Sequence, residues 1–253
     1  MTSIGTGYDY SCTTFSPDGR VFQVEYADKA VEGAPTALGF RCVDGVVLAV
    51  ENLIPSQMLE EDSNRRIHTL DKKLGCAHTG LIPDARQLVA RGRSEARAYR
   101  EQYGSDIPVG HLSDRLTAFV HAHTTYSSIR PFGCSLIIGG FDKKGPHLFL
   151  VEPQGISYEY RASAIGKGAA AAKTEMEKLK FDTLTVDEAL IEAARIIHMV
   201  HDTAKDKDFR LELSWISEKT NFQHVRVPAQ RVAEVQAAAQ RALEALDDED
   251  EEL

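Results

Sequence analysis

The chain has 253 residues, of which 43% are hydrophobic and 26% are charged, and its formal net charge is −9. These fractions are typical of folded globular proteins, and they exclude a collagen-like chain, a wholly disordered chain or a disulfide scaffold. No apolar run reaches the roughly 18 residues of a membrane-spanning helix, and the N-terminus lacks a signal-peptide pattern, so no membrane partner is expected.

The negative charge is concentrated at the C-terminal end. Six consecutive carboxylates occupy residues 247–252. Such a run repels itself and has little apolar surface to bury, so we expect residues 247–253 to form a disordered acidic tail. It could be a solubilising segment or a segment that binds a basic partner. The rest of the chain is nearly balanced and has no basic surface interleaved with aromatic residues, so no nucleic-acid partner is expected.

The four cysteines are scattered along the chain. They are Cys12, Cys42, Cys76 and Cys134. Their spacing contains neither a C-x-x-C pair nor a pattern typical of metal ligands. We therefore expect four reduced thiols in a protein of a reducing, intracellular compartment.

The chain opens with a segment rich in Gly, Ser and Thr. Residues 1–14 have no hydrophobic period, so we expect a flexible arm there. A turn at 15–19 contains Pro and Gly, which favour turns. It leads into a helix over 20–32, where apolar residues recur every three or four positions and so share one face.

After this helix, strands and helices alternate in groups. We expect strands over 36–42, 46–51, 66–70 and 74–79, helices over 83–103 and 111–127, strands over 134–141, 147–151 and 156–160, helices over 167–179 and 185–204, strands over 209–216 and 222–227, and a helix over 228–246.

The spacing of these elements predicts the architecture. Short turns such as Asp44-Gly45 mark hairpins, so the sheets should be largely antiparallel. The continuous apolar run over 46–50 indicates a strand that is covered on both faces. Two sheets packed face to face between helices satisfy this order. The sequence thus predicts one α+β domain over 15–246, a four-layer αββα sandwich with an extra N-terminal helix.

Two local patterns suggest ligand chemistry. His198 and His201 stand three positions apart on a predicted helix and could share a metal ion, but no HExxH pattern or third ligand accompanies them. Residues 165–168 (IGKG) could bind an anion at a helix N-terminus, but they lack the full phosphate-loop spacing. We interpret the first pattern as structural or surface histidines and the second as a tight turn. No metal and no cofactor is therefore expected.

Three stretches resemble one protein family. Tyr8 and Asp9, followed by residues 15–27 (FSPDGRVFQVEYA), are similar to the N-terminal signature of proteasome alpha subunits. Residues 80–86 (GLIPDAR) and 130–133 (RPFG) resemble two further segments of that family. The resemblance runs from about Gly5 to Leu246, and residues 205–215 are most similar to one branch of the family.

This resemblance implies the N-terminal-nucleophile hydrolase sandwich, in agreement with the four-layer prediction. It also implies a structural subunit of the outer (alpha) ring of the 20S proteasome. The expected partners are six other alpha subunits, the beta ring, and regulatory particles or activators that dock on the alpha ring. The implied roles are ring assembly, pore closure and activator docking in ubiquitin-dependent and ubiquitin-independent protein degradation, in the cytoplasm and nucleus.

The resemblance also allows a comparison with the catalytic beta subunits, which cleave peptides with an N-terminal threonine. Aligned on the Asp44-Gly45 turn, the nucleophile position holds Pro35, the acid position Glu51 and the lysine position Arg66. Proline has no hydroxyl, and arginine is always protonated. Thr36 could act only after a cleavage that removes the signature helix. We therefore expect no catalytic residue and a catalytically silent chain.

Two groups of site residues follow from the resemblance. The arm over 1–14 would cross the axial pore, and a gate cluster would hold it aside in the open state: Tyr8, Asp9, Pro17 and Tyr26. Activator tails would dock in a pocket between adjacent alpha subunits, lined by Gly19, Glu25, Arg66 and Gly80. Arg66 replaces the lysine of the family, and a guanidinium can bind a carboxylate bidentately.

Two alternatives stay open on the sequence. The first is a threonine hydrolase that matures by cleavage before Thr36. The second is a free-standing binding module that uses the acidic tail.

Overall fold

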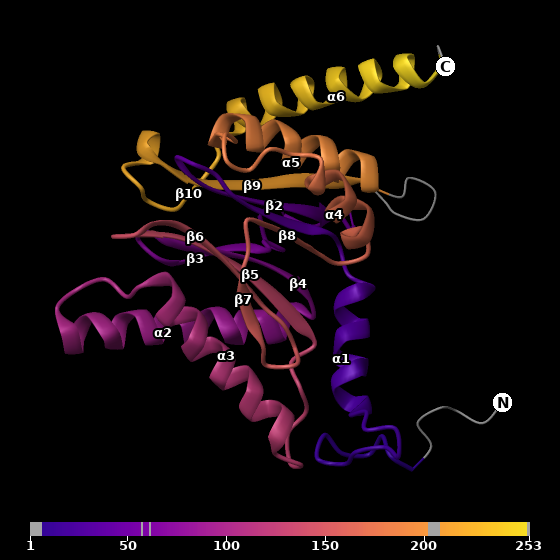
Figure 1. The fold of residues 1–253 in the computed structure, drawn as a ribbon, viewed down its shortest axis with the longest axis vertical. Coiled ribbons are helices and arrows are strands. Elements are labelled where there is room, and N and C mark those ends of the chain that lie inside the picture. Colours follow the sequence, from indigo (N-terminus) through magenta and orange to yellow (C-terminus); the bar gives the residue numbers. More distant parts are fainter. Residues whose placement is uncertain (1–6, 57, 61, 202–207, 252–253) are drawn as a thin grey trace.

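The computed structural model describes residues 7–56, 58–60, 62–201 and 208–251. Two five-stranded antiparallel sheets lie face to face, with helices over both outer faces (Figure 1). Helices α4, α5 and α6 lie over one sheet, α2 and α3 lie against the other, and α1 stands beside the sandwich. The predicted four-layer α+β sandwich with an additional N-terminal helix is confirmed.

The first sheet has the strand order β10-β9-β2-β1-β8. Its strands have the bounds β1 Ala37–Arg41, β2 Gly45–Leu53, β8 Ala162–Ile165, β9 Phe209–Ser217 and β10 Val225–Arg226. β2 lies at the centre, where it pairs with β1 and β9, and its first eight residues are buried. The strand predicted to be covered on both faces is therefore found.

The second sheet has the strand order β3-β4-β5-β6-β7. Its strands have the bounds β3 Ile67–Asp71, β4 Leu74–Gly80, β5 Cys134–Asp142, β6 Gly145–Val151 and β7 Ser157–Glu159. Every neighbouring pair is antiparallel, as expected of strands joined by short turns.

The helices begin and end close to the predicted positions. Their bounds are α1 Phe22–Glu32, α2 Ile82–Tyr103, α3 Val109–Thr125, α4 Ala169–Glu177, α5 Val186–Val200 and α6 Ala229–Glu251. α5 begins with a capping box in which Thr185 and Glu188 satisfy each other's backbone amides. Three hydrophobic clusters fill the three spaces between the four layers.

Three element predictions were wrong in detail. β8 was not predicted, because its four residues have little strand character of their own; it forms by pairing with β1, Ala37 opposite Ile165. α5 ends at Val200 rather than near 204, since His201 is extended and its imidazole reaches another element. α6 continues to Glu251, so the backbone of 247–251 is helical rather than disordered; extending an existing helix needs no new nucleus.

Candidate functional site

The position that the resemblance aligns with the nucleophile of the catalytic beta subunits is buried in this chain. Pro35 and Thr36 immediately precede β1, and Thr36 is 0% exposed. The backbone N–H of Thr36 donates to Glu51 Oε2 at 3.1 Å, and its Oγ1 accepts from the N–H of Gly168 at 3.1 Å. The hydroxyl is therefore engaged with the backbone and closed to solvent, which leaves no room for a substrate carbonyl.

Glu51, which aligns with the acid position of the catalytic beta subunits, has a structural partner. It lies on β2 and is 0% exposed, and its Oε1 lies 2.6 Å from Nδ1 of His201. The carboxylate thus joins the end of α5 to the segment before β1. The sequence predicts His198 and His201 to be structural or surface histidines, and it does not reveal this pairing. Because 150 residues separate His201 from Glu51, no local spacing could reveal it.

The turn at residues 165–168 closes over the same segment. Lys167 N–H donates to the carbonyl of Ala34 at 2.9 Å, and the hydroxyl of Thr79 donates to the carbonyl of Pro35. Gly166 has φ +97°, and a Cβ there would lie 2.5 Å from the Pro35 carbonyl oxygen, so only glycine fits. The predicted tight strand-to-helix turn is confirmed, and its role is to pack against Pro35.

The structure joins two members of the predicted gate cluster. The hydroxyl of Tyr26 donates to Asp9 Oδ2 at 3.4 Å. Burial and the Asp9 carboxylate raise the pKa of Tyr26, so this hydroxyl keeps its proton at neutral pH. Tyr8 and Pro17 are exposed, and neither has a side-chain hydrogen bond to the other members among the described residues. The cluster as a whole therefore stays a prediction.

Two contacts of the arm were not predicted. The side-chain amide of Gln23 donates to the carbonyl of Asp9. Cys12 is 5% exposed, and its thiol donates to the carbonyl of Tyr126 at 3.1 Å. Both partners are backbone atoms, which no sequence pattern marks. Residues 1–6 of the predicted arm lie outside the described residues.

The four residues predicted to bind activator tails fall into two pairs. Arg66 is half-buried, and its guanidinium donates to the carbonyl of Gly80 at 3.5 Å. Gly19, with φ +75°, ends the turn before α1, and Glu25 in the first turn of α1 pairs with Arg20. The described contacts connect neither pair to the other within one chain. The pocket between adjacent subunits therefore stays a prediction.

Two of the family-like stretches meet in space. Asp84 accepts from both terminal nitrogens of Arg130, at 2.6 and 2.8 Å, and from the backbone N–H of Gly133 at 2.9 Å. The carbonyl of Gly133 in turn accepts from the N–H of Leu81 at 2.8 Å. The GLIPDAR and RPFG segments thus form one hydrogen-bonded unit at the start of α2. We call Asp84, Arg130 and Gly133 the Asp84 clasp.

Comparison with known proteins identifies the family. The family model of proteasome subunits matches residues 31–216, and the N-terminal signature of proteasome A subunits matches residues 8–30. The chain belongs to the proteasome alpha-subunit family.

Individual alpha subunits align with almost the whole chain. The chain is 55% identical over 247 residues to proteasome subunit alpha type-3 of rice, covering 98% of this chain and 99% of the relative. It is 58% identical over 250 residues to the alpha type-3 subunit of Acanthamoeba castellanii, covering 99% of each. It is 49% identical over 252 residues to a probable alpha type-7 subunit of Saccharomyces cerevisiae, covering 98% of this chain and 88% of the relative. Alpha type-3 is the branch that residues 205–215 predict.

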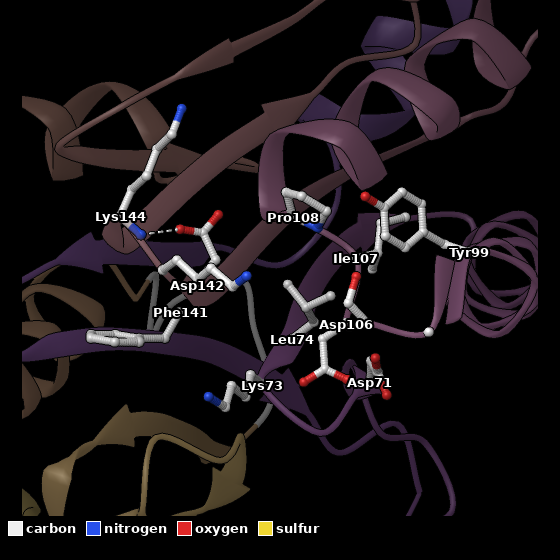
Figure 2. Close-up of a pocket in the computed structure, with 13 residues that line it drawn as sticks. Asp71, Lys73, Leu74, Tyr99, Asp106, Ile107, Pro108, Phe141, Asp142 and Lys144 are labelled. Atoms are coloured by element: carbon white, nitrogen blue, oxygen red, sulfur yellow. Dashed lines mark hydrogen bonds between the residues drawn. The ribbon is translucent and has the colours of Figure 1, made fainter. Parts of the chain in front are cut away.

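A separate pocket of about 620 Å³ opens between the α2–α3 loop and the turns that follow β3 and β5 (Figure 2). Its carboxylates are occupied: Asp142 accepts from the N–H of Lys144 at 2.8 Å, while Asp71 and Asp106 both accept from Arg100. None of the predicted site residues of this alpha subunit lines it. We therefore do not assign it to the candidate site.

His198 on α5 and His201 directly after it do not form a ligand pair in the described structure. Both rings pack against Phe209, with centroids 5.0 Å away for His198 and 4.6 Å for His201. Across the described part of the chain, no three or more His, Cys, Asp or Glu side chains are arranged to hold a metal ion. In the same part, no helix combines the length and the apolar character needed to cross a bilayer.

Proposed function

We propose that this chain is a non-catalytic structural and gating subunit in the outer ring of the 20S proteasome. Its partners would be six other alpha subunits, the beta ring, and regulatory particles or activators that dock on the alpha ring. The alpha type-3 names of its relatives support this role. It would contribute to ring assembly, pore closure and activator docking during ubiquitin-dependent and ubiquitin-independent protein degradation.

The observation that carries catalytic silence is the buried segment before β1. Pro35 offers no hydroxyl at the nucleophile position, and its nitrogen belongs to a tertiary amide rather than a free amine. The neighbouring Thr36 is 0% exposed and hydrogen-bonded on both its amide and its hydroxyl. These contacts also argue against the alternative threonine hydrolase, because cleavage there would require the surrounding turn to open.

Native mass spectrometry of the particle purified through a tag on this chain tests the proposal. We expect a four-ring complex in which this chain keeps an N-terminus at or near Met1. A chain that begins at Thr36 would instead establish a matured hydrolase. The binding-module alternative would be established by a chain that is not part of a ring complex, and that binds a partner protein only while residues 247–253 are present.

The gate cluster makes a testable contribution to opening. We expect Tyr26→Ala to reduce activator-stimulated peptide hydrolysis in the assembled particle severalfold, because it removes both the ring and the hydroxyl that contacts Asp9. Tyr26→Phe should give a smaller loss, since only the hydrogen bond disappears. Tyr103→Ala, an exposed tyrosine at the end of α2, is the matched control. Unchanged stimulation in Tyr26→Ala would remove Tyr26 from the gate.

Activator docking is supported by the state of Arg66. Among the described residues, no carboxylate lies within ion-pair distance of its guanidinium, although most arginines of the chain have such a partner. Burial lowers the pKa of Arg66 and the charge of Glu212 raises it, yet arginine stays protonated at neutral pH. A half-buried cation with no carboxylate partner among the described residues is suited to bind the terminal carboxylate of an activator tail.

We also propose that the chain acts in the cytoplasm and nucleus. Its four cysteines are free and buried, which suits a reducing compartment. Fluorescence microscopy of the tagged chain in living cells tests this location, and a signal confined to the secretory pathway would contradict it.

A further inference from the structure

A buried carboxylate lies behind the backbone of Arg66. Glu212, on β9, is 3% exposed. Its Oε2 accepts from the backbone N–H of Arg66 at 3.0 Å, and its Oε1 accepts from the backbone N–H of Ile67 at 3.2 Å. Because β9 and β3 belong to different sheets, this single side chain connects the two sheets at the point where β3 begins.

The loop before Arg66 is tied to the same carboxylate. The side-chain amide of Asn64 donates to Oδ1 of Asn52 at 2.9 Å and to the carbonyl of Leu53 at 3.1 Å. The amide of Asn52 donates to Glu212 Oε2 at 3.4 Å. Loop, central strand and carboxylate therefore form one network, whose members hold one another in place.

We propose that Glu212 is a positioning residue for Arg66: it holds the backbone of residues 66 and 67 so that the guanidinium faces a tail carboxylate. This inference rests on the activator-docking role of Arg66 proposed above. The oxygens of Glu212 are occupied by backbone amides, so they leave the guanidinium unpaired. The guanidinium's own hydrogen bond, to the Gly80 carbonyl, is long at 3.5 Å, so the position of Arg66 depends chiefly on its backbone.

The test uses assembled 20S particles that contain this chain. The probe is a short photo-crosslinking peptide with a free C-terminal carboxylate, compared with the same peptide carrying a C-terminal amide. Labelling of this subunit is measured by mass spectrometry against peptide concentration. We expect Glu212→Gln to raise the half-maximal concentration of the carboxylate peptide about tenfold, because one acceptor and the charge are lost. Labelling by the amide peptide should not change.

A matched variant and a double variant make the result specific. Glu234→Gln, the same change in an exposed ion pair on α6, should leave labelling unchanged. If Glu212 acts through Arg66, then Glu212→Gln combined with Arg66→Ala should label no worse than Arg66→Ala alone. Additive losses would overturn the positioning role. Asn64→Ala is a milder second variant, expected to weaken carboxylate labelling about threefold if Glu212→Gln does not assemble.

The two proposals fail in different ways. Arg66→Ala that keeps the preference for the carboxylate peptide would refute the docking role of Arg66. A second combination would refute only the role of Glu212. In it, Arg66→Ala loses this preference, whereas Glu212→Gln and Asn64→Ala both keep it.

Discussion

Replacing Glu51 by Ala should destabilise the subunit by about 2–4 kcal/mol, because it removes a buried side chain that holds two hydrogen-bond partners and leaves a cavity. The side chain is 0% exposed, and its two oxygens serve different elements. One accepts from the N–H of Thr36 at 3.1 Å, and the other contacts Nδ1 of His201 at 2.6 Å. Alanine would leave both groups buried without a partner and would also leave a cavity.

Thermal and urea unfolding of the purified chain measure this loss. Glu51→Gln should cost less than the alanine variant, because an amide oxygen can still accept from Thr36. Glu234→Ala is the control, since its ion pair with Arg231 is exposed and should contribute less than about 1 kcal/mol. Equal stability of the Glu51→Ala and Glu234→Ala variants would show that Glu51 does not hold the closed segment.

Replacing Asp84 by Ala should destabilise the start of α2 by about 2–4 kcal/mol. The variant loses all three hydrogen bonds of the Asp84 clasp and leaves the buried N–H of Gly133 without an acceptor. Because 62% of the Arg130 side chain is exposed, solvent screens part of the charge attraction, and the unsatisfied amide dominates the loss. Asp182→Ala, in an exposed ion pair with Arg161, is the control and should change stability little.

The Asp84 clasp should also make stability depend on pH. Hydrogen bonding to Arg130 holds the pKa of Asp84 below its usual range. The carboxylate therefore stabilises the fold fully above the pKa it has in the unfolded chain, about 4, and this contribution is lost as pH falls through the lower pKa of the folded state. Urea unfolding at several acidic pH values should show a shallower decline for Asp84→Ala than for the natural chain. Parallel curves would contradict this account.

The positions that the resemblance aligns with the catalytic residues of beta subunits have structural contacts in this chain. At the acid position, Glu51 is an internal hydrogen-bond acceptor. At the nucleophile position, Pro35 packs against Gly166. At the lysine position, the guanidinium of Arg66 donates to the carbonyl of Gly80 rather than to Pro35 or Thr36. These contacts support the proposal that the chain is catalytically silent, and the half-buried guanidinium of Arg66 is the group proposed to bind activator tails.

The sequence by itself determined the elements and the family. Hairpin turns such as Asp44-Gly45 and the capping box of Thr185 and Glu188 act between residues a few positions apart, so their effects can be predicted from local chemistry. The family signature is likewise a contiguous stretch, residues 8–30, so it could be recognised without the tertiary structure.

Only the tertiary structure decided which distant groups meet. Glu51 and His201 are 150 positions apart, and Glu212 and Arg66 are 146 apart. Such pairs form because the layers of the sandwich stack at one particular register, and neither partner carries a local signal of the other. β8 and the end of α5 depended on the same long-range contacts, since one needs the edge of β1 and the other needs Glu51. Local preferences fix where the chain turns, whereas the packing of the sheets fixes which side chains become partners.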